Sequence, residues 1–201
     1  MFNKPIIGYE ALSQKDCRNV INFSLNHSEK STGKIGGSKD AESGVIDLDI
    51  RNVTTYSPPE NMSEDQLIER GFNLRNIFAS VWESNEKFFH FEIDGAPEFH
   101  VLKYEVGCHY GIHSDVGIFG DDKMKLDTRK LSFSIFLNND YKGGDLVFSG
   151  ISPKEYIKPD TPCKAGDMIV FPSYLYHEVE PVTSGVRWVG VGWLHGKKPF
   201  K

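Results

Sequence analysis

Positions 130–137 read Lys-Leu-Ser-Phe-Ser-Ile-Phe-Leu, and this alternation decides the fold. Successive side chains of a β-strand point to opposite faces of the sheet. One face of this segment would carry large apolar side chains: Leu131, Phe133, Ile135 and Leu137. The other face would carry a smaller and more polar set: Ser132, Ser134 and Phe136. We expect the apolar face to pack against helices and the polar face to line a site.

Short runs of β-forming residues continue on both sides of this segment, divided by Gly, Pro and Asp. They lie at 99–104, 145–148, 167–171, 177–182 and 187–195. Several short strands with turn residues between them are typical of a β-sandwich, barrel or jelly roll. The residues from about 90 to 197 are therefore predicted to form a β-core.

The N-terminal part, to about residue 89, has helical character. A helix is expected over 13–26, where Ser13 can cap the first turn, and a second over 63–81, where acidic residues follow Ser63. The stretch 28–44 is rich in Ser, Gly and Lys and predicts a loop, whereas 45–56 looks extended.

Composition favours one soluble domain spanning residues 1–201. Hydrophobic residues make up 39% of the chain, charged residues 25%, and the formal net charge of −5 disfavours nucleic acid and anionic membranes as partners. The three cysteines, Cys17, Cys108 and Cys163, form no CxxC pair, which favours reduced thiols and a cytoplasmic location. Neither a secretory signal nor a membrane span is expected.

His113 and Asp115 are the first candidate metal ligands. They are two residues apart, so an extended backbone would point both side chains to the same face. A third ligand such as His177 would complete one triangular face of an octahedral ion and leave positions open for a bidentate cosubstrate and O₂. An HxD pair is common by chance, and on composition alone His90 and His109 compete for the ligand role.

Arg187 is the candidate anion-binding residue. It alternates with Val189, Val191 and Trp193 along one expected strand face, and the apolar neighbours indicate that this face is buried. A buried guanidinium requires a partner. A bidentate pair with a bound dicarboxylate would supply one, and so would a salt bridge to an acidic residue of the chain.

The surrounding motifs resemble the prolyl-4-hydroxylase-like branch of the 2-oxoglutarate oxygenases. The first motif is Y-x-x-G-x-x-Y-x-x-H-x-D, which runs from Tyr104 to Asp115. The second begins at His177 and continues through a Pro-Val turn to Arg187, ten positions later. The segments 143–146 and 164–172 also look like this family, and the resemblance extends over about 98–195.

This resemblance implies an α+β fold, with a double-stranded β-helix (jelly-roll) core and N-terminal helices packed on one sheet. It implies Fe(II), 2-oxoglutarate and O₂ as cofactors, with ascorbate as a supporting reductant. It places the metal on His113, Asp115 and His177, and the cosubstrate near Arg187, Ser132 and Tyr104. Phe136 departs from the tyrosine that relatives often have, so either Tyr104 or Tyr110 is expected to compensate, or 2-oxoglutarate is expected to bind more weakly.

The resemblance further implies a peptide or protein substrate, hydroxylated on proline, with Tyr110, Tyr176 and Trp193 as candidate substrate contacts. The loops at 28–44 and 116–128 are expected to control access. Asp115 favours hydroxylation over halogenation, because related halogenases have a small residue in its place. Two alternatives stay open: an oxygenase acting on another side chain or a small molecule, and a non-catalytic cupin-like metal-binding module.

Overall fold

The computed structural model describes residues 6–8, 10–32, 49–94, 97–116, 128–149, 156–157 and 163–196. Its elements are β1 (Ile6–Gly8), α1 (Gln14–His27), β2 (Glu29–Thr32), β3 (Arg51–Asn52), β4 (Thr54–Ser57), α2 (Glu64–Glu69), α3 (Leu74–Ser84), the π-helix η1 (Asn85–Phe89), β5 (Glu98–Tyr104), β6 (His109–His113), β7 (Thr128–Phe136), β8 (Lys142–Gly143), β9 (Leu146–Ser149), β10 (Tyr156–Ile157), β11 (Met168–Pro172), β12 (Tyr176–Val179), β13 (Val182–Ser184) and β14 (Arg187–Gly196).

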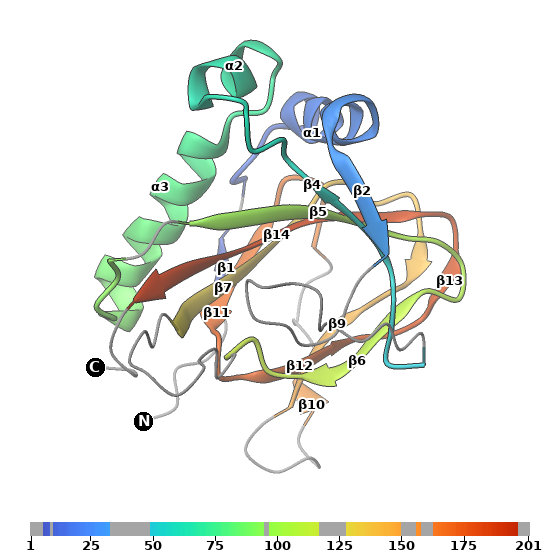
Figure 1. Cartoon of the computed structure of the whole chain (residues 1–201). Coiled ribbons are helices and arrows are strands. Elements are labelled where there is room, and N and C mark those ends of the chain that lie inside the picture. The colour runs from blue at the N-terminus through green and yellow to red at the C-terminus, as the bar shows by residue number, and fades with distance from the viewer. Residues whose placement is uncertain are drawn as a thin grey trace, which may run out of the picture.

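Two antiparallel sheets form the β-core (Figure 1). The major sheet has seven strands in the order β1-β11-β7-β14-β5-β4-β2, and the minor sheet has five in the order β10-β9-β12-β6-β3. A buried cluster that includes Leu102 and Val189 of the major sheet and Phe148 and Val179 of the minor sheet fills the space between them. This two-layer arrangement is that expected of a jelly roll.

The helices lie on the outer face of the major sheet, as the sequence predicted (Figure 1). Helix α1 begins after Ser13, whose hydroxyl accepts a hydrogen bond from the Asp16 backbone N–H. Val20 of this helix and Ile77 of α3 are buried in one cluster with Phe133 of β7. The second helical segment differs from the prediction, because it breaks into α2 and α3.

The break between α2 and α3 has a local cause. Gly71 adopts a positive φ of 81°, which ends the first helix, and the Asn73 side chain then caps the second by accepting from the Arg75 N–H. Phe72, between them, is buried in the helix-sheet cluster. The continuous apolar pattern over 63–81 therefore reflects two short helices that cover the same sheet.

The alternation along β7 is as predicted. Its larger apolar residues, such as Phe133 and Ile135, join the cluster beneath the helices, whereas Phe136 joins the cluster between the sheets. One prediction for the N-terminal part needs correction, because residues 29–32 form β2 instead of a loop. The described part of the expected extended stretch contains β3 and most of β4, and β1, β2 and β4 extend the major sheet.

Several predicted segments lie outside the described residues: 33–44 of the first expected loop, 45–48 of the expected extended stretch, and 117–127 of the second expected loop. In the described part of the chain, no helix has the length and apolar character needed to cross a membrane.

Candidate metal and anion site

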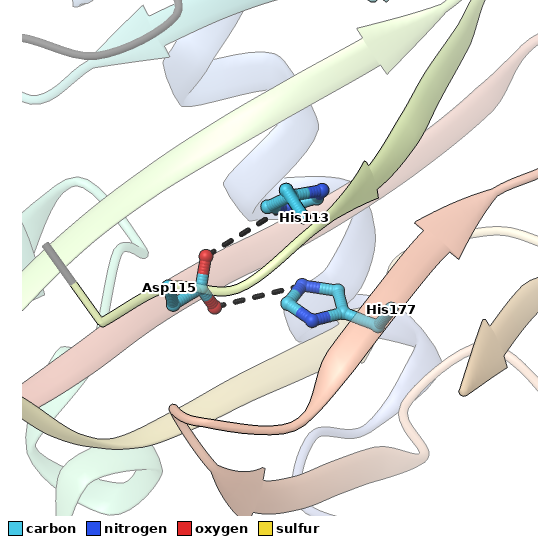
Figure 2. Close-up of side chains that lie close together, drawn as sticks. All are labelled: His113, Asp115 and His177. Carbon is cyan, nitrogen blue, oxygen red and sulfur yellow. Dashed lines mark ion pairs between the residues drawn. The ribbon is translucent and has the colours of Figure 1, made fainter. Parts of the chain in front are cut away.

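His113 and His177 face each other because β6 and β12 pair with these two residues in direct register. Asp115 follows the end of β6 and turns its carboxylate toward both rings (Figure 2). Its two oxygens lie 3.6 Å from the His113 Nε2 and 3.6 Å from the His177 Nε2. These distances exceed those of hydrogen bonds, and the three ligand atoms lie within 4.8 Å of one another.

The backbone orients both histidines in the same way. His113 Nδ1 lies 2.8 Å from the Gly111 carbonyl oxygen, and His177 Nδ1 lies 3.0 Å from the Leu175 carbonyl oxygen. An Nδ1–H that donates to a carbonyl places the lone pair on Nε2, the atom that points toward Asp115. These two backbone contacts therefore preorganise both Nε2 atoms for binding a metal ion.

Asp115 is held by groups from three other strands or turns. Ser132 donates to its Oδ2 at 2.7 Å, and the Trp193 side chain also forms a hydrogen bond with the carboxylate. The Asp115 N–H donates to the Ser173 carbonyl at 3.0 Å, and the Ser173 hydroxyl lies 2.8 Å from that of Ser132. This buried network fixes the carboxylate although Asp115 lies beyond the end of its strand.

The electrostatics of the cluster favour a cation. Burial, followed by repulsion from His177, holds the pKa of His113 well below its usual range, so the ring is neutral and can act as a ligand. Burial acts to raise the pKa of Asp115, but the two histidines and the hydrogen bonds from Ser132 and Trp193 outweigh it, and the net shift is downward. One carboxylate and two imidazoles are the donor set of a facial-triad metal site.

The cluster opens into a cavity of about 410 Å³ between the sheets. At one end of this cavity Arg187 is 1% exposed, and its Nε and Nη1 have no hydrogen-bond partner. Its guanidinium lies 5.1 Å from the centre of the Tyr104 ring and 5.4 Å from that of Phe136. In the described part of the chain no carboxylate pairs with it, so the salt-bridge alternative is not observed there.

Tyr141 is the residue that sequence reasoning missed. Its side chain forms a hydrogen bond with Arg187, and burial raises the pKa of its hydroxyl despite the neighbouring positive charge. Tyr141 lies beyond the end of β7, five positions after Phe136, outside any motif that would have marked it. Tyr141 thus places next to Arg187 the hydroxyl that Phe136 lacks. Tyr110, which was expected to compensate for Phe136, instead stacks on His113, with the two ring centres 3.6 Å apart.

Gly144 explains how Arg187 fits into this corner. Its φ is 66°, and a Cβ atom at this position would lie 2.8 Å from Arg187 Cδ. Gly144, the second glycine of the Gly-Gly-Asp-Leu segment, is thus required because it adopts a positive φ and because Arg187 approaches its backbone closely.

At the other end of the cavity the charged side chains are paired. Arg129 Nη2 donates to both oxygens of Glu98, at 3.1 and 3.0 Å, and the guanidinium lies 3.7 Å from the centre of the Trp193 ring. His100 and His195 approach the same carboxylate at 2.9 and 3.4 Å. Burial acts to raise the pKa of Glu98, but its histidine and arginine partners outweigh burial and hold the pKa far below its usual range.

The predicted substrate contacts separate into two groups. Tyr110 and Trp193 line the cavity, but Tyr176 does not and is 54% exposed, because its side chain points away from the face that carries His177. Ser132, predicted near the cosubstrate, donates a hydrogen bond to the metal-site carboxylate of Asp115. The competing histidines lie elsewhere: His109 bonds to the Asp49 carbonyl, and His90 follows η1.

The β-core of this chain is similar in sequence to a known protein family. The profile described as the 2OG-Fe(II) oxygenase superfamily matches residues 99–195. Among curated proteins, a PKHD-type hydroxylase of Gloeothece citriformis is 42% identical over 46% of this chain and 40% of its own length. A PKHD-type hydroxylase of Thermosynechococcus vestitus is 42% identical over 64% of this chain and 58% of its own. The chain thus spans about half the length of these relatives.

Solved structures share the fold at lower identity. A prolyl hydroxylase of Trichoplax adhaerens, in complex with a hypoxia inducible factor oxygen degradation domain peptide fragment, superposes with a TM-score of 0.69 and 18% identity, covering 96% of this chain and 83% of that one. A Pseudomonas putida prolyl-4-hydroxylase gives 0.65 and 20%, covering 98% and 94%. These matches agree with the predicted jelly-roll core and its N-terminal helices.

Proposed function

Because this chain belongs to the 2OG-Fe(II) oxygenase superfamily through residues 99–195, we propose that it is an iron(II)- and 2-oxoglutarate-dependent dioxygenase that hydroxylates a prolyl residue of a peptide. One observation carries the proposal. A two-histidine, one-carboxylate cluster and a buried arginine without a carboxylate partner line the same cavity. The first is suited to a metal with open positions, and the second to an anion.

The metal would be held by the Nε2 atoms of His113 and His177 and by the carboxylate of Asp115. The donor set fits Fe(II), and the neutral state of His113 means that no proton has to be displaced from that ring before binding. Ser132 and Trp193 would keep the Asp115 carboxylate oriented once the ion has neutralised its charge.

Arg187 would bind the far carboxylate of 2-oxoglutarate. Its Nε and Nη1 hydrogens are unused in the described structure, and a carboxylate could accept a charge-assisted hydrogen bond from either nitrogen. Tyr141 would hold the guanidinium in position, while Tyr104 and Phe136 exclude water from the pair. The orphaned nitrogens are the sign in this structure that a ligand belongs there.

Bound iron and 2-oxoglutarate supply the oxidative chemistry: decarboxylation to succinate and CO₂ with O₂ as the oxidant, and transfer of one oxygen atom to the substrate. The residues of the chain position the reactants. Phe171 and Phe148 pack near His177, with ring centres 4.8 and 6.1 Å from that of the histidine, and would help to hold its ring in position.

A prolyl substrate is favoured by resemblance. The curated relatives are PKHD-type hydroxylases, and one solved structure with the same fold is a prolyl hydroxylase with a peptide bound. We further propose that residues 1–201 act as one domain, because α1 and α3 bury the outer face of the β-core. The three free cysteines are consistent with the reducing cytoplasm that we propose as the location.

The test is mass spectrometry of proline-containing peptides incubated with Fe(II), 2-oxoglutarate, ascorbate and O₂. We expect a gain of one oxygen atom on proline, matched by succinate and absent in His177→Ala and Arg187→Ala. Oxidation of a free metabolite with no peptide modified would favour the small-molecule alternative. Metal binding without any 2-oxoglutarate binding under anaerobic Fe(II) would favour the non-catalytic cupin-like module.

A further inference from the structure

Hydroxyl groups line the wall of the cavity at β2 and β4. We define the hydroxyl shelf as Ser31 of β2 with Thr55 and Ser57 of β4; all three side chains line the cavity. Ser31 and Thr55 are directly paired across the strands, and Thr55 is paired in turn with Leu102 of β5. The shelf therefore continues the inner face of the major sheet, on the strands two and three positions away from β14, which carries Arg187.

Thr55 is the unusual member of the shelf. Its side chain belongs to a residue that is only 8% exposed, and its Oγ1 has no hydrogen-bond partner. A buried hydroxyl without a partner costs free energy that an apolar residue of the same shape would not. Thr55 lines the cavity, so a polar group of a ligand bound there could pair with this hydroxyl and remove the cost.

Ser57 has a defined hydrogen-bond role. Its Oγ lies 2.9 Å from His100 Nδ1, and His100 Nε2 lies 2.9 Å from the Glu98 carboxylate. Whichever of the two atoms donates in the Ser57–His100 hydrogen bond, the Ser57 oxygen keeps a lone pair that can accept from a ligand. Thr55 has no hydrogen-bond partner, so its hydroxyl proton is available for donation.

The charge of this wall selects the class of ligand. Glu98 and Arg129, the charged groups next to the shelf, are already paired with each other. A ligand recognised by its carboxylates would not gain an ion pair from Ser31, Thr55 or Ser57. A neutral ligand with both donors and acceptors would match one hydroxyl that accepts and another that donates, and the peptide main chain has this composition.

We propose that the hydroxyl shelf binds the main chain of the substrate peptide beside the oxidised residue, with Thr55 donating to a peptide carbonyl and Ser57 accepting from a peptide N–H. This inference rests on the proposed function and deepens it by locating the specificity-determining contacts. Recognition through main-chain groups would make the shelf tolerant of the flanking side chains, since every peptide bond offers the same two groups.

The matched pair of variants is Thr55→Val and Thr54→Val. Both remove one hydroxyl from β4 at nearly constant volume, but adjacent residues point to opposite faces, and Thr54 is not a cavity residue. Loss of one neutral hydrogen bond corresponds to about a 3- to 10-fold change. We expect Thr55→Val to raise the KM for a peptide substrate by that factor. The KM for 2-oxoglutarate should stay unchanged, and so should the iron content of the protein. Thr54→Val should leave all three unchanged.

A second readout has the opposite sign. Thr55→Val should leave the melting temperature of the substrate-free protein unchanged or higher, because it removes an unsatisfied buried hydroxyl. A structural role for Thr55 would instead lower it. A melting temperature that falls together with the affinity for peptide would therefore overturn the proposal, and so would equal effects of the two valine variants.

Failure of the shelf can be distinguished from failure of the proposed function. N-acetylproline N-methylamide, which carries both peptide groups, serves as the binding probe for protein loaded with Mn(II) and 2-oxoglutarate, followed by ligand-detected NMR. We expect weaker binding to Thr55→Val and to Ser57→Ala than to Thr54→Val. If wild type oxidises no peptide but the probe discriminates these variants, the proposed function fails and the shelf stands. Binding that is identical in all variants overturns the shelf even where peptides are oxidised.

Discussion

Two arginines line the same cavity, and only one of them is paired with a carboxylate in the described structure. Arg129 donates hydrogen bonds to both oxygens of Glu98, and its guanidinium lies over the Trp193 ring. Arg187 is buried beside the aromatic rings of Tyr104 and Phe136, with two of its nitrogens unpartnered. A buried cation that lacks a carboxylate is costly, so it indicates a missing ligand, whereas a paired cation is part of the fixed framework. The two ends should therefore respond differently to mutation.

The largest effect is expected between the two ends, at the metal ligands. Replacing His177, His113 or Asp115 with alanine should abolish stoichiometric iron binding and reduce 2-oxoglutarate turnover by more than about a hundredfold. Mutation of residues that only hydrogen-bond to metal ligands already lowers metal affinity or activity by about 10- to 100-fold. Asp115→Gly should lose hydroxylation even if some metal stays bound. Iron analysis and succinate release measure both quantities. Full turnover with stoichiometric iron in any one variant contradicts the ligand assignment.

Arg187→Ala should weaken 2-oxoglutarate binding by at least about a hundredfold, because deleting one partner of a buried pair costs roughly 3–5 kcal/mol. Metal binding should change far less, since the guanidinium is predicted to contact the far carboxylate. Arg187→Lys should keep part of the affinity by retaining the charge. Anaerobic titration of the Fe(II) protein with 2-oxoglutarate measures this; an unchanged affinity in Arg187→Ala would falsify the assignment.

Glu98→Gln tests the paired end. The amide cannot neutralise Arg129, so the variant should lose about 1–2 kcal/mol of unfolding free energy, a value between those of exposed and buried pairs because 34% of the Glu98 side chain is exposed. Arg187→Met should act in the opposite direction and stabilise the ligand-free protein. Urea unfolding of both variants measures the contrast, and equal signs would remove the distinction between the two ends.

The stability of the wild-type protein should depend on the ionisation of Glu98 at acidic pH. The pKa of Glu98 is lowered on folding, from an unfolded value of about 4.3, so its contribution to stability is present above about pH 5 and is lost as the pH falls through the folded pKa. The stability difference between wild type and Glu98→Gln should therefore shrink between about pH 5 and pH 3. Urea midpoints at several pH values measure it. A constant difference would mean that the Glu98 carboxylate is not the titrating group.

The smallest effect is expected at Tyr176. Its ring is exposed and points away from the cavity, although it is adjacent to His177 in the chain. Tyr176→Ala should change the KM for peptide and 2-oxoglutarate by less than about twofold, as is usual for exposed side chains outside a site. Steady-state kinetics of Tyr176→Ala and Thr55→Val, measured side by side, give the two KM values for peptide. A larger increase in KM for Tyr176→Ala than for Thr55→Val would place the substrate on the outer surface of β12.

Features that depend on short-range spacing could be predicted from the sequence. The alternation of β7, the cap at Ser13 and the two-residue separation of His113 and Asp115 are local, because the backbone geometry of a strand or a helix turn sets where neighbouring side chains point. The ten-residue separation of His177 and Arg187 was recognised through its resemblance to a family motif. The fold class, the candidate triad and the role of Arg187 were predicted from the local patterns and this resemblance together.

Which distant residues complete the site depends on the tertiary structure and could not be predicted from the sequence. Tyr141 reaches Arg187, Ser173 reaches Ser132, and Thr55 enters the cavity because strands far apart in sequence are paired in a particular register. The split between α2 and α3 likewise follows from a positive φ at Gly71 and a buried Phe72. Composition and spacing carry no information about register between distant strands, since a shift of one residue would turn each of these side chains to the other face.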